Sequence, residues 1–263
     1  MAFRYGEDAG VTCHSYATLT LWLLGYPAQG RTQIDAALTL AQQSAHPFSL
    51  VFALSCAAWL HKLRRDGRAA QEHAEATIVL ATEQGFPYFM ACGAILRGWA
   101  LAQQGQAKEG IDQLHQGLIA FRATGAEIWR PYFLACLAEA YGTMEQPEAG
   151  LTALAEALTL VDTTGERWYE AELYRLKGVL LLQQSSSNQT EAESCFHQAI
   201  AIAQDQQAKS LELRATTSLA RLWQQQGKRQ EAHDLLAPVY HWFTEGFDTA
   251  DLKDAKTLLD ELA

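Results

Sequence analysis

Hydrophobic and polar residues recur along this chain with the three- and four-residue spacing of amphipathic helices. Residues 86–125 show the pattern most clearly: small or apolar residues recur over 90–101, polar residues follow at 103–106, and a second periodic run covers 110–121. Such spacing gives each of two helices one apolar face. Gly105 follows the first run, at a position where glycine commonly ends a helix. The segment is therefore expected to form a helical hairpin.

The hairpin pattern repeats along the chain. Small residues recur at two equivalent positions of each repeat, and each set of equivalent positions is called a column here. The first column is Gly30, Ala70, Gly110, Gly150, Ala192 and Ala232, and the second is Thr18, Ala58, Gly98, Ala138, Gly178 and Ala220. Every step is 40 residues, except one of 42 in each column. Repeats with a period of 20–50 residues are typical of solenoids, in which each unit buries its apolar face against its neighbours. The sequence thus predicts an all-α solenoid of six helical hairpins.

The predicted repeats together form one domain over residues 1–263. They cover 8–44, 46–85, 86–125, 127–165, 167–206 and 208–246, and a capping helix with aspartates in its first turns follows over 249–262. The longer step reflects a serine-rich insertion at 184–189, which is expected to be an exposed loop. The array is expected to wind into a right-handed superhelix.

Glycine occurs inside several predicted helices, where it costs up to ~1 kcal/mol relative to alanine. These positions are Gly98, Gly110, Gly117, Gly150 and Gly178. Their use predicts that the helix backbones approach closely there.

Composition and charge exclude several classes of protein. Hydrophobic residues make up 49% of the chain and charged residues 19%, as in a folded protein. The net charge is −10, and no basic stripe is present, so no nucleic acid partner is expected. No apolar run is long enough for a membrane helix or a signal peptide, so no membrane contact and a cytoplasmic location are expected.

Residues suited to catalysis or metal binding form no recognisable pattern. The five cysteines are odd in number and lack a CxxC pair. Cys56 and Cys136 lie two repeat periods apart, which favours small buried thiols. The histidines form neither HExxH nor HxH. We therefore expect no catalytic, cofactor-binding or metal-binding residues, and a protein that is not an enzyme.

Small residues at these offsets in a helical hairpin resemble the tetratricopeptide repeat, although that repeat has about 34 residues. Lengthened repeats of this kind are similar to the superhelical domain of the maltotriose-responsive transcription activator. Four segments further resemble the C-terminal repeat region of bacterial multidomain signalling proteins. They are 19–27 (LTLWLLGYP), 166–178 (ERWYEAELYRLKG), 218–229 (SLARLWQQQGKR) and 236–252, which holds LAPVY and EGFDTADL.

Those signalling proteins join a class III adenylate/guanylate cyclase domain or a kinase-like domain to a STAND-type ATPase and a repeat array. The resemblance implies that this chain holds the last repeats only. It carries over no nucleotide chemistry, because Gly227 and Lys228 precede Arg229 and do not complete a GxxxxGK[ST] motif.

The resemblance also implies that the first helix of each pair lines a concave surface. Residues at equivalent positions of successive first helices then form an aromatic stretch in the earlier repeats and a charged stretch in the later ones. The predicted groove residues are Phe52, Trp59, Trp99, Tyr132, Glu139, Glu172, Arg175, Arg214 and Arg221. Aromatic residues and arginines are common binding hot spots.

A core role is the alternative for the aromatic residues, since aromatic side chains at helical spacing usually pack inside. Exposure of Trp59 and Trp99 is favoured because later repeats place Glu139 and Arg221 at the same column position, and buried sites rarely hold charges. Two other tryptophans, at 129 and 168, are expected to pack between repeats.

The leading functional hypothesis is a non-enzymatic interaction and sensor module. It would bind a peptide or protein segment in its groove and regulate an attached ATPase or cyclase in a parent protein. One alternative is a receptor domain for a sugar-like or nucleotide-like small molecule. Another is a scaffold that forms a homodimer through the N-terminal repeat, where apolar surface is expected around Tyr16, Leu19 and Leu23.

Overall fold

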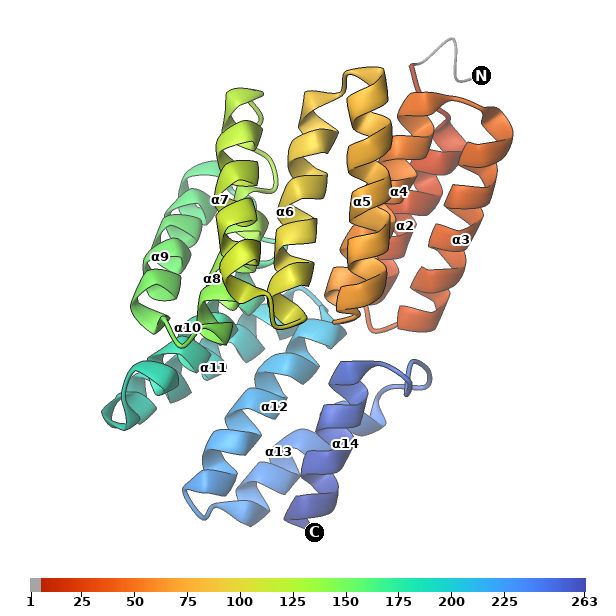
Figure 1. Cartoon of the computed structure of the whole chain (residues 1–263). Helices are drawn as coiled ribbons and strands as arrows, with labels where there is room; N and C mark the ends of the chain where they lie inside the picture. Colours follow the sequence, from red (N-terminus) through yellow and green to blue (C-terminus); the bar gives the residue numbers. More distant parts are fainter. Residues whose placement is uncertain (1–5) are drawn as a thin grey trace. The chain divides into compact units, whose positions relative to one another are not determined.

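The computed structural model describes residues 6–263, and every regular element among them is a helix (Figure 1). The helices pair in chain order and form an all-α solenoid of hairpins. The pairs are α2 (Ala9–Leu23) with α3 (Pro27–Ser44), α4 (Pro47–Leu63) with α5 (Gly67–Gln84), α6 (Pro87–Gln103) with α7 (Ala107–Ala123), α8 (Arg130–Thr143) with α9 (Pro147–Thr164), α10 (Glu170–Gln184) with α11 (Gln189–Asp205), and α12 (Lys209–Gln225) with α13 (Arg229–His241). A further helix, α14 (Ala250–Leu262), follows the last pair.

Helix ends follow from capping and proline chemistry. Pro47 and Pro87 stand in the first turns of α4 and α6, where proline presets φ and its missing N–H is not needed. The Asp66 carboxylate accepts a hydrogen bond from the Ala69 N–H at 3.1 Å and caps α5. Gly105 takes a φ of 86° after α6, the left-handed conformation expected of a residue that ends a helix.

The serine-rich insertion is more ordered than the expected loop. It forms a short 3-10 helix, η1 (Ser186–Asn188), between α10 and α11. Ser186 and Ser187 are exposed, as predicted, while the Asn188 side-chain amide donates to the Leu181 carbonyl oxygen at 3.1 Å. Hydrogen bonds back to α10 thus give the inserted residues a regular turn.

The two columns of small residues meet inside the hairpins. A Cβ atom added to Gly110 would lie 2.4 Å from the carbonyl oxygen of Gly98, and one added to Gly98 would lie 2.7 Å from that of Gly110. In the first hairpin, a Cβ atom at Gly30 would lie 2.9 Å from the Thr18 carbonyl oxygen. These separations leave no room for a larger side chain, so the predicted close approach of the helix backbones is confirmed.

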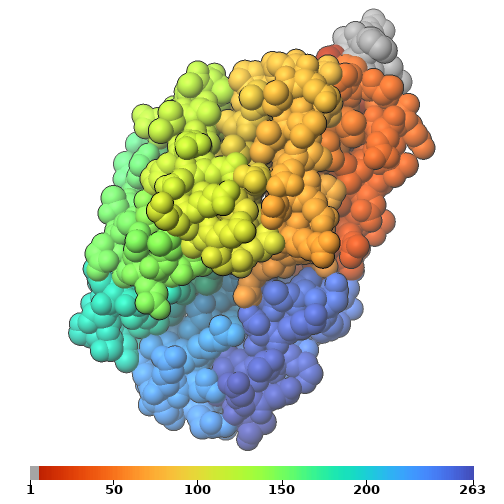
Figure 2. Space-filling view, in the orientation of Figure 1, coloured from red at the N-terminus to blue at the C-terminus, as the bar shows by residue number. Residues whose placement is uncertain are grey.

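First and second helices of the pairs differ in burial. Every residue from Ser55 to Leu60 on α4 is buried, so this first helix is covered all round in that stretch. The second helix α5 is buried at 70, 74, 77 and 81, one stripe with steps of four and three. In the space-filling view, the exposed sides of α5 and α7 face the viewer, in the orange and the yellow-green regions (Figure 2).

Residue contacts divide the chain into two compact units. One contains α2 to α7, and the other contains α8 to α14. The prediction of a single domain over 1–263 therefore stays a prediction. None of the helices in residues 6–263 combines the length and apolar character needed to span a membrane.

Candidate functional site

The nine predicted groove residues all lie on first helices of the pairs. Phe52, Trp59 and Trp99 belong to the first unit, on α4 and α6, and Tyr132, Glu139, Glu172, Arg175, Arg214 and Arg221 belong to the second, on α8, α10 and α12. Their arrangement differs sharply between the aromatic and the charged members.

Three of the aromatic members lack the exposed ring that a binding groove requires. Trp59 is 6% exposed, Trp99 is 1% exposed and Tyr132 is fully buried. The expected exposure is therefore wrong, and the core alternative describes these rings. The reason is visible at Trp99, whose ring centre lies 5.6 Å from the buried Lys62 ammonium of the preceding first helix. At this column position the Trp99 ring therefore packs against the preceding first helix, α4, and is closed to a ligand.

Phe52 is half-buried and belongs to an aromatic cluster of the first unit. Its ring centre lies 5.6 Å from that of Tyr16 on α2 and 6.4 Å from that of Phe89 on α6. The Phe48 ring meets Phe89 edge-on at 5.4 Å. Such pairs contribute about 0.5–1.5 kcal/mol each beyond their area. Phe52 therefore ties successive first helices together.

The first repeat exposes less apolar surface than expected for a dimer interface. Tyr16 is 49% exposed, but Leu19 is only 7% exposed and Leu23 is half-buried. The expectation is thus wrong for Leu19, whose side chain packs inside the unit. A homodimer through this repeat stays a prediction.

Tyr132 joins a second aromatic cluster, built from adjacent repeats. Its ring centre lies 5.3 Å from that of Trp168 and 4.9 Å from that of Tyr169. Trp129 and Trp168 meet at 5.5 Å, which confirms their predicted packing between repeats. The Glu166 carboxylate accepts hydrogen bonds from the Trp129 backbone N–H at 2.8 Å and the Trp168 indole N–H at 3.1 Å. These contacts make the cluster structural.

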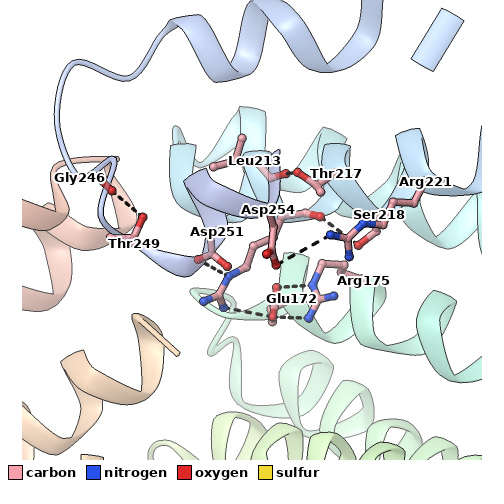
Figure 3. Close-up of polar contacts among 11 residues, drawn as sticks. Glu172, Arg175, Leu213, Thr217, Ser218, Arg221, Gly246, Thr249, Asp251 and Asp254 are labelled. Carbon is pink, nitrogen blue, oxygen red and sulfur yellow. Dashed lines mark hydrogen bonds and ion pairs between the residues drawn. The ribbon is translucent and has the colours of Figure 1, made fainter. Parts of the chain in front are cut away.

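Three of the charged members, Glu172, Arg175 and Arg214, form a connected network in the second unit (Figure 3). Glu172 on α10 is 1% exposed, and Arg175 binds both of its carboxylate oxygens, at 2.9 and 2.7 Å. Arg214 on α12 donates from Nη1 to Glu172 at 3.3 Å and from Nε to Asp251 of α14 at 2.9 Å. Bidentate arginine–carboxylate contacts are among the strongest polar contacts in proteins. The network thus joins Glu172 and Arg175 of α10 to Arg214 of α12, and Arg214 to Asp251 of α14.

Electrostatics keep the arginines of this network charged. Burial lowers the pKa of Arg214, but Asp251 and Glu172 raise that pKa by more, so the net shift is upward. The pKa of Arg175 is also raised, chiefly because Glu172 outweighs the effect of burial. The half-buried Glu139 acts in the same direction on both arginines. Arg175 and Arg214 therefore remain positively charged within the network.

Two network residues, Asp251 and Asp254, were not predicted as part of the site. The sequence suggested only a role in starting the capping helix. In the structure Asp251 contacts Arg214, and Asp254 lies 3.9 Å from the exposed Arg221. A signal was present, because aspartates three apart on one helix and arginines seven apart on another each share a helix face. Arg221 lies in this outer pair and not with Glu172 and Arg175.

Thiols and possible metal ligands occur throughout residues 6–263. No group of three or more His, Cys, Asp or Glu there could hold a metal ion. Cys56, Cys92, Cys136 and Cys195 are buried, as predicted for structural thiols, and Cys13 is exposed. Burial raises the pKa of Cys56 to about 12, which keeps it a thiol at neutral pH.

Comparison with known proteins places the chain by fold and not by family. No family model matches it. An uncharacterized protein of Rhizobium meliloti (strain 1021) is 24% identical over 217 residues, which cover 82% of this chain and 21% of that protein. The chain thus spans about a fifth of the length of the curated relative it matches.

Solved structures of similar fold cover nearly the whole chain. The apo form of RapI has a TM-score of 0.64 and 11% identity, and the match covers 97% of this chain and 86% of that one. NprR in complex with its cognate peptide NprX gives 0.59 and 14%, with 97% and 78% covered. A STAND protein with a tetratricopeptide repeat sensor from Pyrococcus horikoshii gives 0.53 and 14%, with 96% and 38% covered. The tetratricopeptide-like solenoid fold is thereby established.

Proposed function

We propose that this chain is an interaction and sensor module that binds a peptide or protein segment. The observation that carries the proposal is the likeness to NprR, which was solved with its cognate peptide and matches 97% of this chain. Solenoids offer extended surfaces built from successive repeats, which suits an elongated ligand.

The charged side chains of the second unit are the best candidates for contacting that segment. The Arg221 side chain is 52% exposed, the Arg175 side chain is 18% exposed, and Glu139 is half-buried. Part of each of these side chains is exposed, whereas the rings of Trp59 and Trp99 are buried. Arginine is enriched among residues that dominate binding energy.

We further propose that a longer parent protein uses the array to regulate an attached ATPase or cyclase. The Pyrococcus horikoshii STAND protein combines such a repeat sensor with an ATPase, and this chain matches 38% of it. The Rhizobium meliloti relative is also several times longer than the matched segment.

Capture from extracts of the source cells tests the proposal. The tagged chain should retain a protein or peptide that mass spectrometry identifies, and calorimetry with the purified partner should then give a dissociation constant. We expect Arg221→Glu to weaken binding by about tenfold or more, which corresponds to about 1.4 kcal/mol. Arg68→Glu is the matched control, because Arg68 is an exposed arginine of the first unit that pairs with Glu72 one turn away.

Two results would count against the proposal. If no protein or peptide is retained at micromolar concentrations, the chain is not such a module. If a partner binds the Arg221→Glu and Arg68→Glu chains equally well, the charged face of the second unit is not its site.

A further inference from the structure

Helix α14 lies where the first helix of another repeat would lie. Along the array, first helices pack directly against the next first helix, as α8 does against α10 and α10 against α12. Helix α14 packs against α12 in the same way and also contacts α13. The face of α12 that α14 covers is therefore a surface that this fold builds to receive a helix.

The apolar part of this contact is a single stripe on α14. Its buried residues are Leu252, Ala255, Leu258, Leu259 and Leu262. They join a cluster that includes Leu213 of α12, Leu236 of α13 and Phe243. The opposite side of α14 is exposed, with Lys256 and Asp260 paired at 2.8 Å. The helix is therefore amphipathic, and its register on α12 is set by one stripe.

The charged part of the contact adds chemical specificity. Arg214 and Arg221 of α12 contact Asp251 and Asp254 of α14, at 2.9 and 3.9 Å. Figure 3 shows Asp254 facing Arg221, and a dashed line from Asp251 marks its ion pair with Arg214. The inner pair is almost fully buried and the outer pair is exposed. A helix seated here must supply two carboxylates three residues apart, beside its leucine stripe.

Helix α14 depends on this docking for its own stability. It has 13 residues, and isolated helices of this length are marginal in water. It is joined to α13 by the segment 242–249, where Thr249 donates from its backbone N–H and its hydroxyl to the Gly246 carbonyl oxygen, at 2.8 and 2.7 Å. Phe243 of this segment is buried in the same cluster as the α14 stripe, so α14 and the segment are expected to open together, as one local unit.

We propose that the α14-covered face of α12 is a docking surface for an acidic amphipathic helix of a partner protein, and that α14 is the intrachain competitor for it. The partner helix carries two aspartates or glutamates three residues apart, next to a leucine-rich stripe. This inference rests on the proposed function and deepens it: it names the class of segment and a means of regulation. Access is limited by the fraction of chains in which α14 is released, which lowers the apparent affinity by that fraction.

A fluorescent synthetic peptide of residues 246–263 serves as the probe, and fluorescence anisotropy measures its binding to the full chain. The Asp251→Arg/Asp254→Arg chain should bind the peptide at least about tenfold more tightly than the wild-type chain, because its own α14 is repelled by Arg214 and Arg221. The matched control is Asp234→Arg/Asp260→Arg, which changes the net charge equally at two exposed aspartates whose ion pairs lie within their own helices. It should behave as wild type.

A changed peptide tests whether the two carboxylates are required for binding. A peptide with both aspartates changed to asparagine should bind the Asp251→Arg/Asp254→Arg chain, called the opened chain, at least about tenfold more weakly than the unchanged peptide does. The reason is that its charge-assisted contacts are lost. Equal binding of both peptides, or equal binding to opened and wild-type chains, would overturn the proposal.

Hydrogen exchange on the wild-type chain tests the proposal even if the charge-reversed Asp251→Arg/Asp254→Arg chain does not fold. The amides of α14 should exchange at least about tenfold faster than those of α12, because α14 opens without global unfolding. Exchange of α14 together with α12 would overturn the competitor role. A wild-type dimer held by exchanged α14 helices would assign the surface to a second copy and overturn the partner-protein assignment.

The two proposals fail in different ways. If the peptide never binds but a captured partner still responds to Arg221→Glu, the docking surface is wrong and the interaction module stands. If the peptide binds but no cellular partner is found, the receiving surface exists and the proposed function fails.

Discussion

At the residue scale, small side chains set the geometry of the hairpins. Gly98 and Gly110 face each other across α6 and α7 so closely that neither can carry a Cβ atom in place. The cost of glycine in a helix is accepted there because it allows the helix backbones to touch. This feature was predictable from the sequence, since the two columns keep a common 40-residue step.

Gly110→Ala should destabilise the chain although alanine favours helices. Overpacking costs about 1–3 kcal/mol, whereas helix propensity returns up to ~1 kcal/mol, so we expect a net loss of about 1 kcal/mol. Urea denaturation measures it. Gly67→Ala is the matched control, because a Cβ atom there would meet its nearest neighbour at 3.5 Å, an ordinary contact. Equal stability of the two variants would contradict the close crossing.

At the element scale, the sequence predicted which helices exist but not how the first helices are buried. The stripe on α5 follows from its spacing, because a half-buried helix shows one apolar face. On α4, burial of consecutive residues removes that periodicity, so spacing could not separate a core tryptophan from a groove tryptophan. The docking of α14 was not predicted for another reason: the spacing of the aspartates on α14 and of the arginines on α12 does not say that these two helices pair.

A histidine pair between α4 and α5 makes the first unit sensitive to acid. The rings of His61 and His73 stack at 5.2 Å, with an interplanar angle of 13°. Burial, reinforced by His73, lowers the pKa of His61 from 6.5 to about 4, and burial also lowers the pKa of His73. The charged groups around the pair are Asp66, Arg64, Arg31, Glu72 and Asp35.

Between pH 4 and 6.5 the folded chain therefore binds fewer protons at His61 than the unfolded chain does. The contribution of His61 to the free energy of unfolding is complete above about pH 6.5. It declines by up to about 3 kcal/mol as the pH falls toward 4. Urea denaturation at about pH 7.5 and about pH 5 should show a smaller pH effect in His61→Gln than in wild type. His233→Gln, at a more exposed histidine, should keep the wild-type pH dependence. Unchanged pH dependence in His61→Gln would exclude the pair as the cause.

At the scale of the whole molecule, the repeat predicted the fold and only part of the candidate site. The 40-residue step gave hairpins whose helices fall within the predicted repeats, and solved tetratricopeptide-like structures match over nearly the full chain. Glu172, Arg175 and Arg214 lie within ion-pair distance of one another, but Glu172 and Arg214 are buried, so a charged groove stays a prediction; Trp59, Trp99 and Tyr132 belong to the core. Fold alone does not name a ligand, because solenoids of one architecture present different side chains.

The central claim is that the first helices of the second unit bind a peptide or protein segment. Site-specific photo-crosslinking in the source cells tests it most directly, with a photoreactive amino acid at Ser218, one turn before Arg221 on α12, or at the exposed Thr159 on the second helix α9. We expect a discrete protein or peptide adduct from position 218 that mass spectrometry identifies, and none from position 159. Adducts equal at both positions, or absent from both, would contradict it.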